Sequence, residues 1–183
     1  GVPVAINIEN GIAAMALAQL SGVSNEDIKT GMASFRGVDR RFDFKIKTDK
    51  MVYLSDYAHH PEEIKQSILS MRALYGDKKL TGIFQPHLYT RTRDFYQEFA
   101  ESLSLLDEVI LTDIYPAREL PIEGVSSQLI YDNLRPDIDK ILCTKEEVID
   151  ILKKKEIEVL MTLGAGDIEN YAPQICEILN ERC

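Results

Sequence analysis

The chain has 183 residues, of which 45% are apolar and 28% charged, and its formal net charge is −9. This length indicates one domain, or one domain with part of another. The acidic balance argues against nucleic acid as a partner, because neutralising a phosphate backbone requires a basic surface. No apolar run approaches the ~20 residues that cross a bilayer, so no membrane contact is predicted.

The location predicted from composition is the cytoplasm. The first residues carry no basic segment of the kind that begins a signal peptide. The three cysteines, Cys143, Cys176 and Cys183, have no CxxC spacing. This number and spacing favour reduced thiols over a disulfide framework or a zinc site.

The amino-terminal segment, residues 1–36, is predicted to be helical. Apolar residues from Ile8 to Leu20 fall near helical spacing until Gly22, and Ser24 begins a second short helix that ends near Phe35. Two helices of this size cannot enclose a core. We therefore expect them to dock on the rest of the chain or to belong to a domain that is not included here.

Residues 37–183 alternate predicted strands with predicted helices. The strands are 42–46, 51–54, 80–84, 108–112, 138–143 and 159–163, and helices begin at Pro61, Asp94, Ser126 and Glu146, with a last helix ending at Glu181. The helix at Pro61 has an apolar stripe of Ile64, Ile68, Met71 and Leu74. This order favours an α/β fold that is three-layered and Rossmann-like, with a mainly parallel sheet and helices on both faces.

Polar and glycine-rich segments follow four of the predicted strands. Ligands of such sheets bind beyond the carboxyl ends of the strands, so we expect these segments to form one cleft. They are Asp56-Tyr57-Ala58-His59-His60, Gln85-Pro86-His87, Asp113-Ile114-Tyr115 and Gly164-Ala165-Gly166-Asp167.

All three histidines, His59, His60 and His87, lie in these segments. Adjacent histidines project differently, and no further Cys, His or carboxylate stands at zinc spacing, so no metal site is predicted. Two interpretations stay open for the histidines. They orient the backbone and cap the helix at Pro61, or an imidazole contacts substrate near that helix amino terminus, where an anion is favoured.

Arginines supply the basic groups of the predicted cleft. Arg91 lies in the predicted loop 87–93 and offers a fork of donors that matches a carboxylate or phosphate. Arg93 stands beside Asp94 and is interpreted as one half of a surface pair. Arg40 and Arg41 lie at the predicted domain junction, where a ligand contact and a structural bridge are both compatible with the sequence.

The segment Gly164–Asp167 has two interpretations as well. It could cradle a phosphate, or it could be a tight strand-to-helix turn capped by Asp167. The chain has no G-x-x-x-x-G-K-[ST] phosphate loop, no nucleophile elbow and no HExxH motif. We therefore assign no catalytic residue within it.

Taken together, these motifs resemble the Mur ligase family over nearly the whole chain. Asn7 and Asn10 resemble the paired asparagines that close the family's central ATPase domain, so residues 1–36 correspond to its helical tail and 37–183 to the carboxy-terminal domain. The motifs 37–43, 56–61 and 163–168 follow in the expected order. Gln85-Pro86-His87 and Tyr89–Arg93 are similar to the alanine-adding member, although Leu88 stands where many relatives have a basic residue.

The resemblance implies ATP-dependent amide formation between L-alanine and UDP-N-acetylmuramate through an acyl phosphate. It assigns ATP binding to Asn7, Asn10, Arg41 and Asp56, and binding of L-alanine to Tyr57, His59 and Arg91. The phosphate loop, the Mg²⁺ ligands and the UDP-binding domain of the family precede this region. We therefore expect the chain to pack against a central domain in the full-length ligase and to be inactive alone.

Two alternatives stay open at this point. A related ligase of the family attaches a tripeptide during recycling and shares the His-His-Pro element, but the arginine segment argues against it. A noncatalytic Rossmann-like nucleotide-binding module would account for the missing phosphate loop. A dehydrogenase is disfavoured because the glycine-rich dinucleotide fingerprint is absent.

Overall fold

The computed structural model describes residues 5–35 and 37–182, and the chain divides into two compact units, Gly1–Val38 and Asp39–Cys183. The first unit is a pair of helices, α1 (Ala5–Leu20) and α2 (Asn25–Ser34), as predicted. The Ser24 hydroxyl accepts a hydrogen bond from the Asp27 amide at 3.2 Å and so caps α2. No residue of α2 is buried, and Ile12 and Leu17 of α1 are exposed, so the pair encloses no core of its own.

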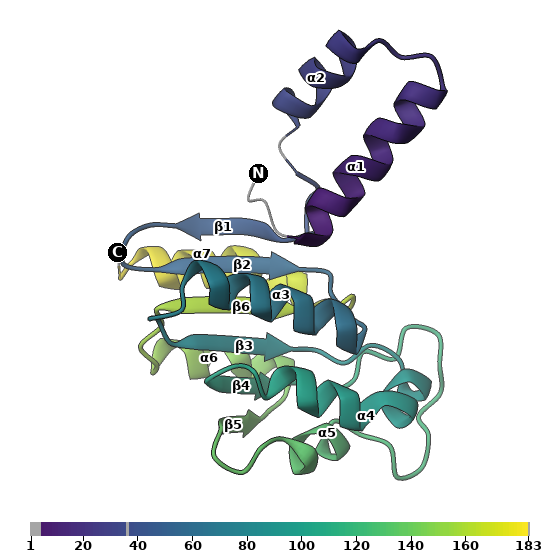
Figure 1. Cartoon of the computed structure of the whole chain (residues 1–183). Helices are drawn as coiled ribbons and strands as arrows, with labels where there is room; N and C mark the ends of the chain where they lie inside the picture. The colour runs from purple at the N-terminus through teal and green to yellow at the C-terminus, as the bar shows by residue number, and fades with distance from the viewer. Residues whose placement is uncertain (1–4, 36, 183) are drawn as a thin grey trace. The chain divides into compact units, whose positions relative to one another are not determined.

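The second unit is built on a six-stranded sheet with the strand order β1-β2-β6-β3-β4-β5. The edge strand β1 is antiparallel to β2, and all other neighbours are parallel, which confirms a mainly parallel sheet (Figure 1). The strands are β1 (Asp43–Lys47), β2 (Val52–Asp56), β3 (Leu80–Phe84), β4 (Glu108–Leu111), β5 (Asp139–Leu142) and β6 (Val159–Leu163).

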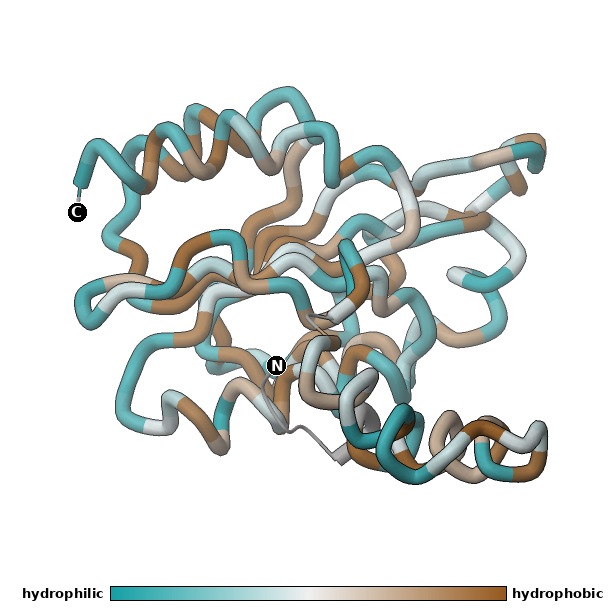
Figure 2. The backbone as a smooth tube through the Cα atoms, turned by 90° about the horizontal axis from the view of Figure 1, so that it is seen from above, coloured by the Kyte–Doolittle hydropathy of each residue, from teal (hydrophilic) through white to brown (hydrophobic). Residues whose placement is uncertain are grey.

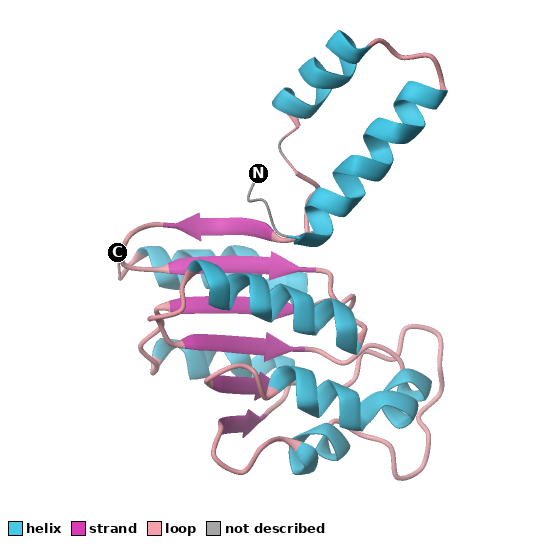
Figure 3. Ribbon diagram, viewed as in Figure 1, coloured by secondary structure: helices cyan, strands magenta, loops and turns pink. Residues whose placement is uncertain are grey.

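Helices cover both faces of this sheet, so the predicted three-layer α/β architecture is confirmed (Figure 3). One face packs against α3 (Pro61–Leu74), α4 (Tyr89–Leu103) and α5 (Gln128–Asn133). The other packs against α6 (Val148–Lys153) and α7 (Ala172–Asn180), which the short 3-10 turns η1 (Lys145–Glu147) and η2 (Ile168–Tyr171) precede.

The core lies in the middle of the sheet, where the strands are hydrophobic along their length (Figure 2). Every residue of β3 and β6 is buried, as expected for parallel strands covered on two faces. Ile64, Ile68 and Met71 of α3 are fully buried, as the apolar stripe predicted. The inclusion of Leu74 in that stripe is wrong. Leu74 is the last residue of α3, at the end of the packed helix face, and its side chain is 45% exposed.

The start of α4 corrects a second prediction. The helix begins at Tyr89 and not at Asp94, so Arg91 and Arg93 lie on its first turns and not in a loop. Phe95 departs from helical geometry with φ −131° and ψ 18°. The helix is therefore irregular at Phe95. The residues before Phe95 show no apolar spacing typical of a helix, so the sequence does not predict that this turn belongs to α4.

None of the helices within the described ranges is long and apolar enough to span a bilayer.

Candidate functional site

The loops that follow the parallel strands lie together beyond the carboxyl ends of these strands, on the right in Figure 1. The predicted segments after β2, β3, β4 and β6 all lie there, because parallel strands end on the same side. A parallel bridge between His87 and Tyr115 joins the loops after β3 and β4. The site is therefore composed of residues that are far apart in the sequence.

A chain of ring contacts connects three of these loops. The ring centroids of Tyr57 and His59 are 5.2 Å apart, those of His59 and His87 6.1 Å, and those of His87 and Tyr115 5.6 Å with nearly parallel planes. Arg91 places Nη1 3.4 Å from Nδ1 of His87. The residues predicted to bind L-alanine, Tyr57, His59 and Arg91, are thus brought into one cluster.

His87 and Tyr115 were not assigned a role from the sequence, although their motifs were singled out as strand-end segments. A guanidinium only donates hydrogen bonds, so Nδ1 of His87 accepts from Arg91 and the imidazole proton lies on Nε2. Burial, together with the charge of Arg91, lowers the pKa of His87. His87 is consequently a neutral imidazole at pH 7.

His59 has a different set of partners. Its Nδ1 lies 2.9 Å from the Tyr57 carbonyl oxygen, which places the ring proton of neutral His59 on Nδ1. The Glu63 carboxylate accepts hydrogen bonds from the backbone amides of His59 and His60, at 3.0 and 3.2 Å. The helix end at Pro61 is therefore capped by Glu63, and the ring of His60 packs 5.1 Å from Phe95.

Two arginines approach the Tyr57 ring from the start of the second unit. The guanidinium carbon of Arg40 lies 4.8 Å from the ring centroid and that of Arg41 5.7 Å. Arg40 also donates from Nη2 to the Gly166 carbonyl at 3.3 Å, so it bridges to the loop after β6. Arg41 is exposed and forms no hydrogen bond or ion pair with the described residues, which leaves its guanidinium available for an anion.

Asp56 is the last residue of β2, and its carboxylate is partly used within the protein. Oδ1 accepts from the Ala58 amide at 3.3 Å, and Oδ2 accepts from the Ser67 hydroxyl. Burial raises the pKa of Asp56, although these hydrogen bonds oppose the shift. A carboxylate has about four lone-pair positions, so it can accept a further hydrogen bond from a ligand.

Gln85 connects the loops after β3 and β6. Its side chain is 2% exposed, donates from Nε2 to Oδ1 of Asp167 at 2.7 Å, and accepts at Oε1 from the Ile168 amide at 3.0 Å. Lys145 forms an ion pair with the same carboxylate. Burial disfavours the charged form of Asp167, but hydrogen bonds from Lys145 and Gln85 lower its pKa overall.

These contacts decide how the segment Gly164–Asp167 is built. A Cβ on Gly166 would come 2.2 Å from Oε1 of Gln85, and one on Gly164 would come 2.6 Å from its carbonyl oxygen. The glycines therefore permit close packing on Gln85, in agreement with the tight-turn interpretation. The proposed cap was wrong: Asp167 forms no side-chain cap on η2, because its carboxylate is engaged by Gln85 and Lys145.

Residues with a strained backbone conformation lie next to several of the site residues described above. The non-glycine residues of the described ranges with positive φ are Arg40 (63°), Phe42 (50°), Leu88 (75°) and Ala117 (51°). Arg40 and Phe42 flank Arg41, and Leu88 lies between His87 and the first turn of α4. Such conformations cost free energy and persist where the surroundings enforce them, which is common at functional sites.

The remaining predicted site residues lie elsewhere. Asn10 is an exposed residue of α1 in the first unit, and the side chain of Asn7 lies outside the described residues. Arg93 forms an exposed ion pair with Asp94 at 2.7 Å, which confirms the predicted surface pair. No three His, Cys, Asp or Glu side chains within 5–35 and 37–182 come together as a metal site requires.

Comparison with known proteins shows what this arrangement is similar to. The family model for the Mur ligase, glutamate ligase domain, matches residues 40–168. The chain is 78% identical over 182 residues to a UDP-N-acetylmuramate–L-alanine ligase of Phocaeicola vulgatus, and 59% identical over 179 residues to that of Parabacteroides distasonis. These matches include 100% and 98% of this chain, but the chain spans only 40% and 38% of the length of the two relatives.

Solved structures agree with this result. The UDP-N-acetylmuramate-alanine ligase of Thermotoga maritima superposes with a TM-score of 0.80 at 26% identity, over 100% of this chain and 39% of that one. A murein peptide ligase of Psychrobacter arcticus superposes with a TM-score of 0.72 at 17% identity, over 98% and 38% of the two chains, which shows a shared fold.

Proposed function

This chain belongs to the Mur ligase family, and we propose that it is the carboxy-terminal part of an ATP-dependent ligase that joins L-alanine to UDP-N-acetylmuramate in the synthesis of peptidoglycan precursors. The observation that carries the proposal is the cluster of Tyr57, His59 and Arg91 beside the Asp56 carboxylate. The similarity to alanine-adding ligases of other bacteria supports the choice of amino acid.

The cluster offers complementary groups for both ends of a small amino acid. The Arg91 guanidinium can pair with the carboxylate in a charge-assisted hydrogen bond. His59 has its proton on Nδ1, so Nε2 is the acceptor that can hold the amine. Tyr57 forms the wall beside His59.

The nucleotide side of the proposal rests on Arg41 and Asp56, with Asn7 and Asn10 contacting the adenine. The guanidinium of Arg41, which has no hydrogen bond or ion pair within 5–35 and 37–182, fits a phosphate, and the Asp56 carboxylate can accept from a ribose hydroxyl. Amides such as those of the two asparagines can pair with the N6 and N7 edge of adenine. Mg²⁺ would be held by residues of the ligase outside this chain, where it neutralises phosphate charge.

In the proposed reaction, ATP phosphorylates the muramyl carboxylate and releases ADP. The amine of L-alanine then attacks the acyl carbon, the amide bond forms, and phosphate leaves. The residues of this chain bind and orient the amino acid and part of the nucleotide. Because domain closure over both substrates provides proximity and excludes water, we propose that the chain alone has no ligase activity.

The first unit and the cellular location complete the proposal. Ile12, Leu17 and Leu20 of α1 are exposed, and we propose that the central domain of the complete ligase covers such apolar residues. Cys143 and Cys176 are free thiols. Free thiols are typical of the cytoplasm, which is the proposed location.

A tripeptide-recycling ligase is the second candidate. It shares its fold with this chain, as the murein peptide ligase of Psychrobacter arcticus shows, but at 17% identity this likeness does not favour the tripeptide acceptor. A noncatalytic nucleotide-binding module gains no support from the comparisons. The acceptor preference of the complete ligase, L-alanine or tripeptide, decides between the two enzymes.

The test measures ADP release by the complete ligase with ATP, UDP-N-acetylmuramate and L-alanine. Replacing Arg91 by methionine (Arg91→Met) should raise KM for L-alanine by about 30-fold and leave KM for ATP unchanged, because one charge-assisted contact is lost. Arg93→Met on the same helix is the matched control and should behave as wild type, since Arg93 forms an exposed ion pair with Asp94, its one ion-pair partner in the described part of the chain. Turnover with tripeptide but not with L-alanine would contradict the proposal, as would an unchanged KM in Arg91→Met.

A further inference from the structure

The amino terminus of α4 has no cap within its own sequence. The N-cap residue is Leu88, whose side chain has no hydrogen-bond acceptor and whose φ is 75°. The first amides of a helix have no intrahelical partner and are normally satisfied by Ser, Thr, Asp or Asn at this position. The helix that carries Arg91 therefore depends on another part of the chain.

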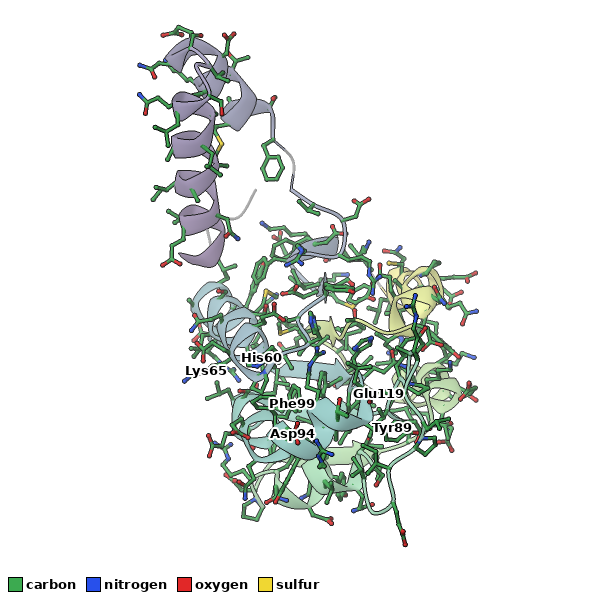
Figure 4. All side chains as sticks on the ribbon, turned by 90° about the vertical axis from the view of Figure 1, so that its right-hand side faces the viewer. His60, Lys65, Tyr89, Asp94, Phe99 and Glu119 are labelled. Carbon is green, nitrogen blue, oxygen red and sulfur yellow. The ribbon has the colours of Figure 1, made fainter. Side chains whose placement is uncertain are left out.

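Glu119, in the loop between β4 and α5, supplies the missing acceptor. Its Oε2 accepts from the Thr90 amide at 3.0 Å, and its Oε1 accepts from the Thr90 hydroxyl. These hydrogen bonds, from the hydroxyl first and then from the amide, lower the pKa of Glu119, to which the Tyr89 amide also contributes. Figure 4 shows Glu119 next to Tyr89 at the start of the helix.

The same loop holds the residue before the helix. The Leu88 amide donates to the Tyr115 carbonyl at 3.0 Å, and the Tyr115 amide donates to the Pro86 carbonyl at 2.8 Å. The Tyr115 ring stacks on His87. Between Tyr115 and Glu119 the chain turns through Ala117, which has positive φ, and the Glu119 amide bonds back to the Pro116 carbonyl at 2.9 Å.

Because Arg91 follows Thr90 directly, these contacts hold the helical turn from which its side chain extends. We propose that Glu119 is a positioning residue for the amino-acid substrate: its carboxylate caps α4 in place of Leu88 and so holds Arg91 against His87. The inference rests on the proposed function. It also assigns the substrate carboxylate to Arg91 and not to the Thr90 amide, since that amide already donates to Glu119.

The first test uses the 183-residue chain and needs no activity. Hydrogen exchange of the Thr90 amide should become about tenfold faster in Glu119→Ala, because its acceptor is lost, whereas exchange in β3 should not change. Glu119→Gln retains an acceptor oxygen and should restore most of the protection. Glu123→Ala is the matched control, since Glu123 lies in the same loop, is exposed and forms no hydrogen bond or ion pair with the described residues. Unchanged exchange at Thr90 in Glu119→Ala would overturn the cap.

The second test uses the complete ligase. Glu119→Ala should raise KM for L-alanine about tenfold, with kcat and KM for ATP within about twofold of wild type. In an Arg91→Met background the same substitution should have no further effect, because Glu119 acts through Arg91. Full additivity of the two substitutions would overturn the positioning role even if the cap exists. Absence of alanine-dependent turnover in the wild-type ligase would instead overturn the proposed function, and the exchange result would still stand.

Discussion

Replacing Gln85 by alanine should destabilise the second unit by about 3 kcal/mol. The substitution removes the donor to the Asp167 carboxylate at 2.7 Å and the acceptor of the Ile168 amide at 3.0 Å. A hydrogen bond to a charged group contributes about 1.5–3 kcal/mol, and a buried amide left without an acceptor costs about 1–3 kcal/mol. Gln85 and Ile168 are each 2% exposed, so the Ile168 amide is left without an acceptor in a buried position, whereas the Asp167 carboxylate is 26% exposed and keeps its ion pair with Lys145.

Chemical denaturation followed by near-UV circular dichroism measures this effect selectively. The chain has 8 tyrosines and 0 tryptophans, and the first tyrosine is Tyr53, so the tyrosine signal reports the second unit. The control is Gln128→Ala, because Gln128 donates to Asp132 at 2.6 Å on the exposed surface of α5, where such pairs contribute only about 0.2–0.5 kcal/mol. A loss below about 1 kcal/mol in Gln85→Ala, or equal losses in both variants, would refute the reasoning.

Two further predictions concern charge. Glu108→Gln should lower the free energy of unfolding by about 2–3 kcal/mol at pH 7, because Glu108 is 2% exposed and its partner Lys155 would lose its counter-charge. Burial opposes the ionisation of Glu108, but Lys155 and the other partners of Glu108 lower its pKa. The stabilising contribution of the ionised carboxylate is therefore present above its ordinary pKa of 4.5 and should be lost as the pH falls below that value. Denaturation curves that give the same difference in unfolding free energy between wild type and variant at pH 3 as at pH 7 would contradict this. For His87, an NMR titration of the 183-residue chain should show a midpoint below 6.5 that rises in Arg91→Met, because burial and the Arg91 charge lower its pKa. A partly buried histidine that is neutral in the folded state adds stability that is lost as the pH falls from 6.5, and a wild-type midpoint at or above 6.5 would contradict the assigned geometry.

Much of the fold could be predicted from periodicity. The inner strands β2, β3, β4 and β6 are almost entirely buried, as is the stripe of Ile64, Ile68 and Met71, whereas the edge strands β1 and β5 are only partly buried. Burial on one face or two is what the apolar pattern encodes. The rule for strand ends also placed Asp56 and His87 correctly at one edge of the sheet. These predictions succeed because each depends on neighbouring residues in the sequence.

The start of α4 could not be predicted, for a physical reason. Leu88 does not resemble a cap, and its positive φ is unusual for a bulky residue. The acceptor that satisfies Thr90 comes from Glu119, 29 residues later. Local reasoning about helix ends has no access to such a partner, so it begins the helix at Asp94.

Residues expected to bind ligands can be recognised from the sequence more easily than the residues that hold these binding residues in place. A carboxylate ligand requires a guanidinium or a similar donor, so the chemistry itself restricts the residue type at position 91 and makes it recognisable. The supporting contacts have no such restriction. Gln85 reaches Asp167 across 82 residues and Arg40 reaches Gly166 across 126. Any side chain of suitable length and hydrogen-bonding capacity could meet these needs, so their positions follow from the packing of the sheet edge and not from a motif.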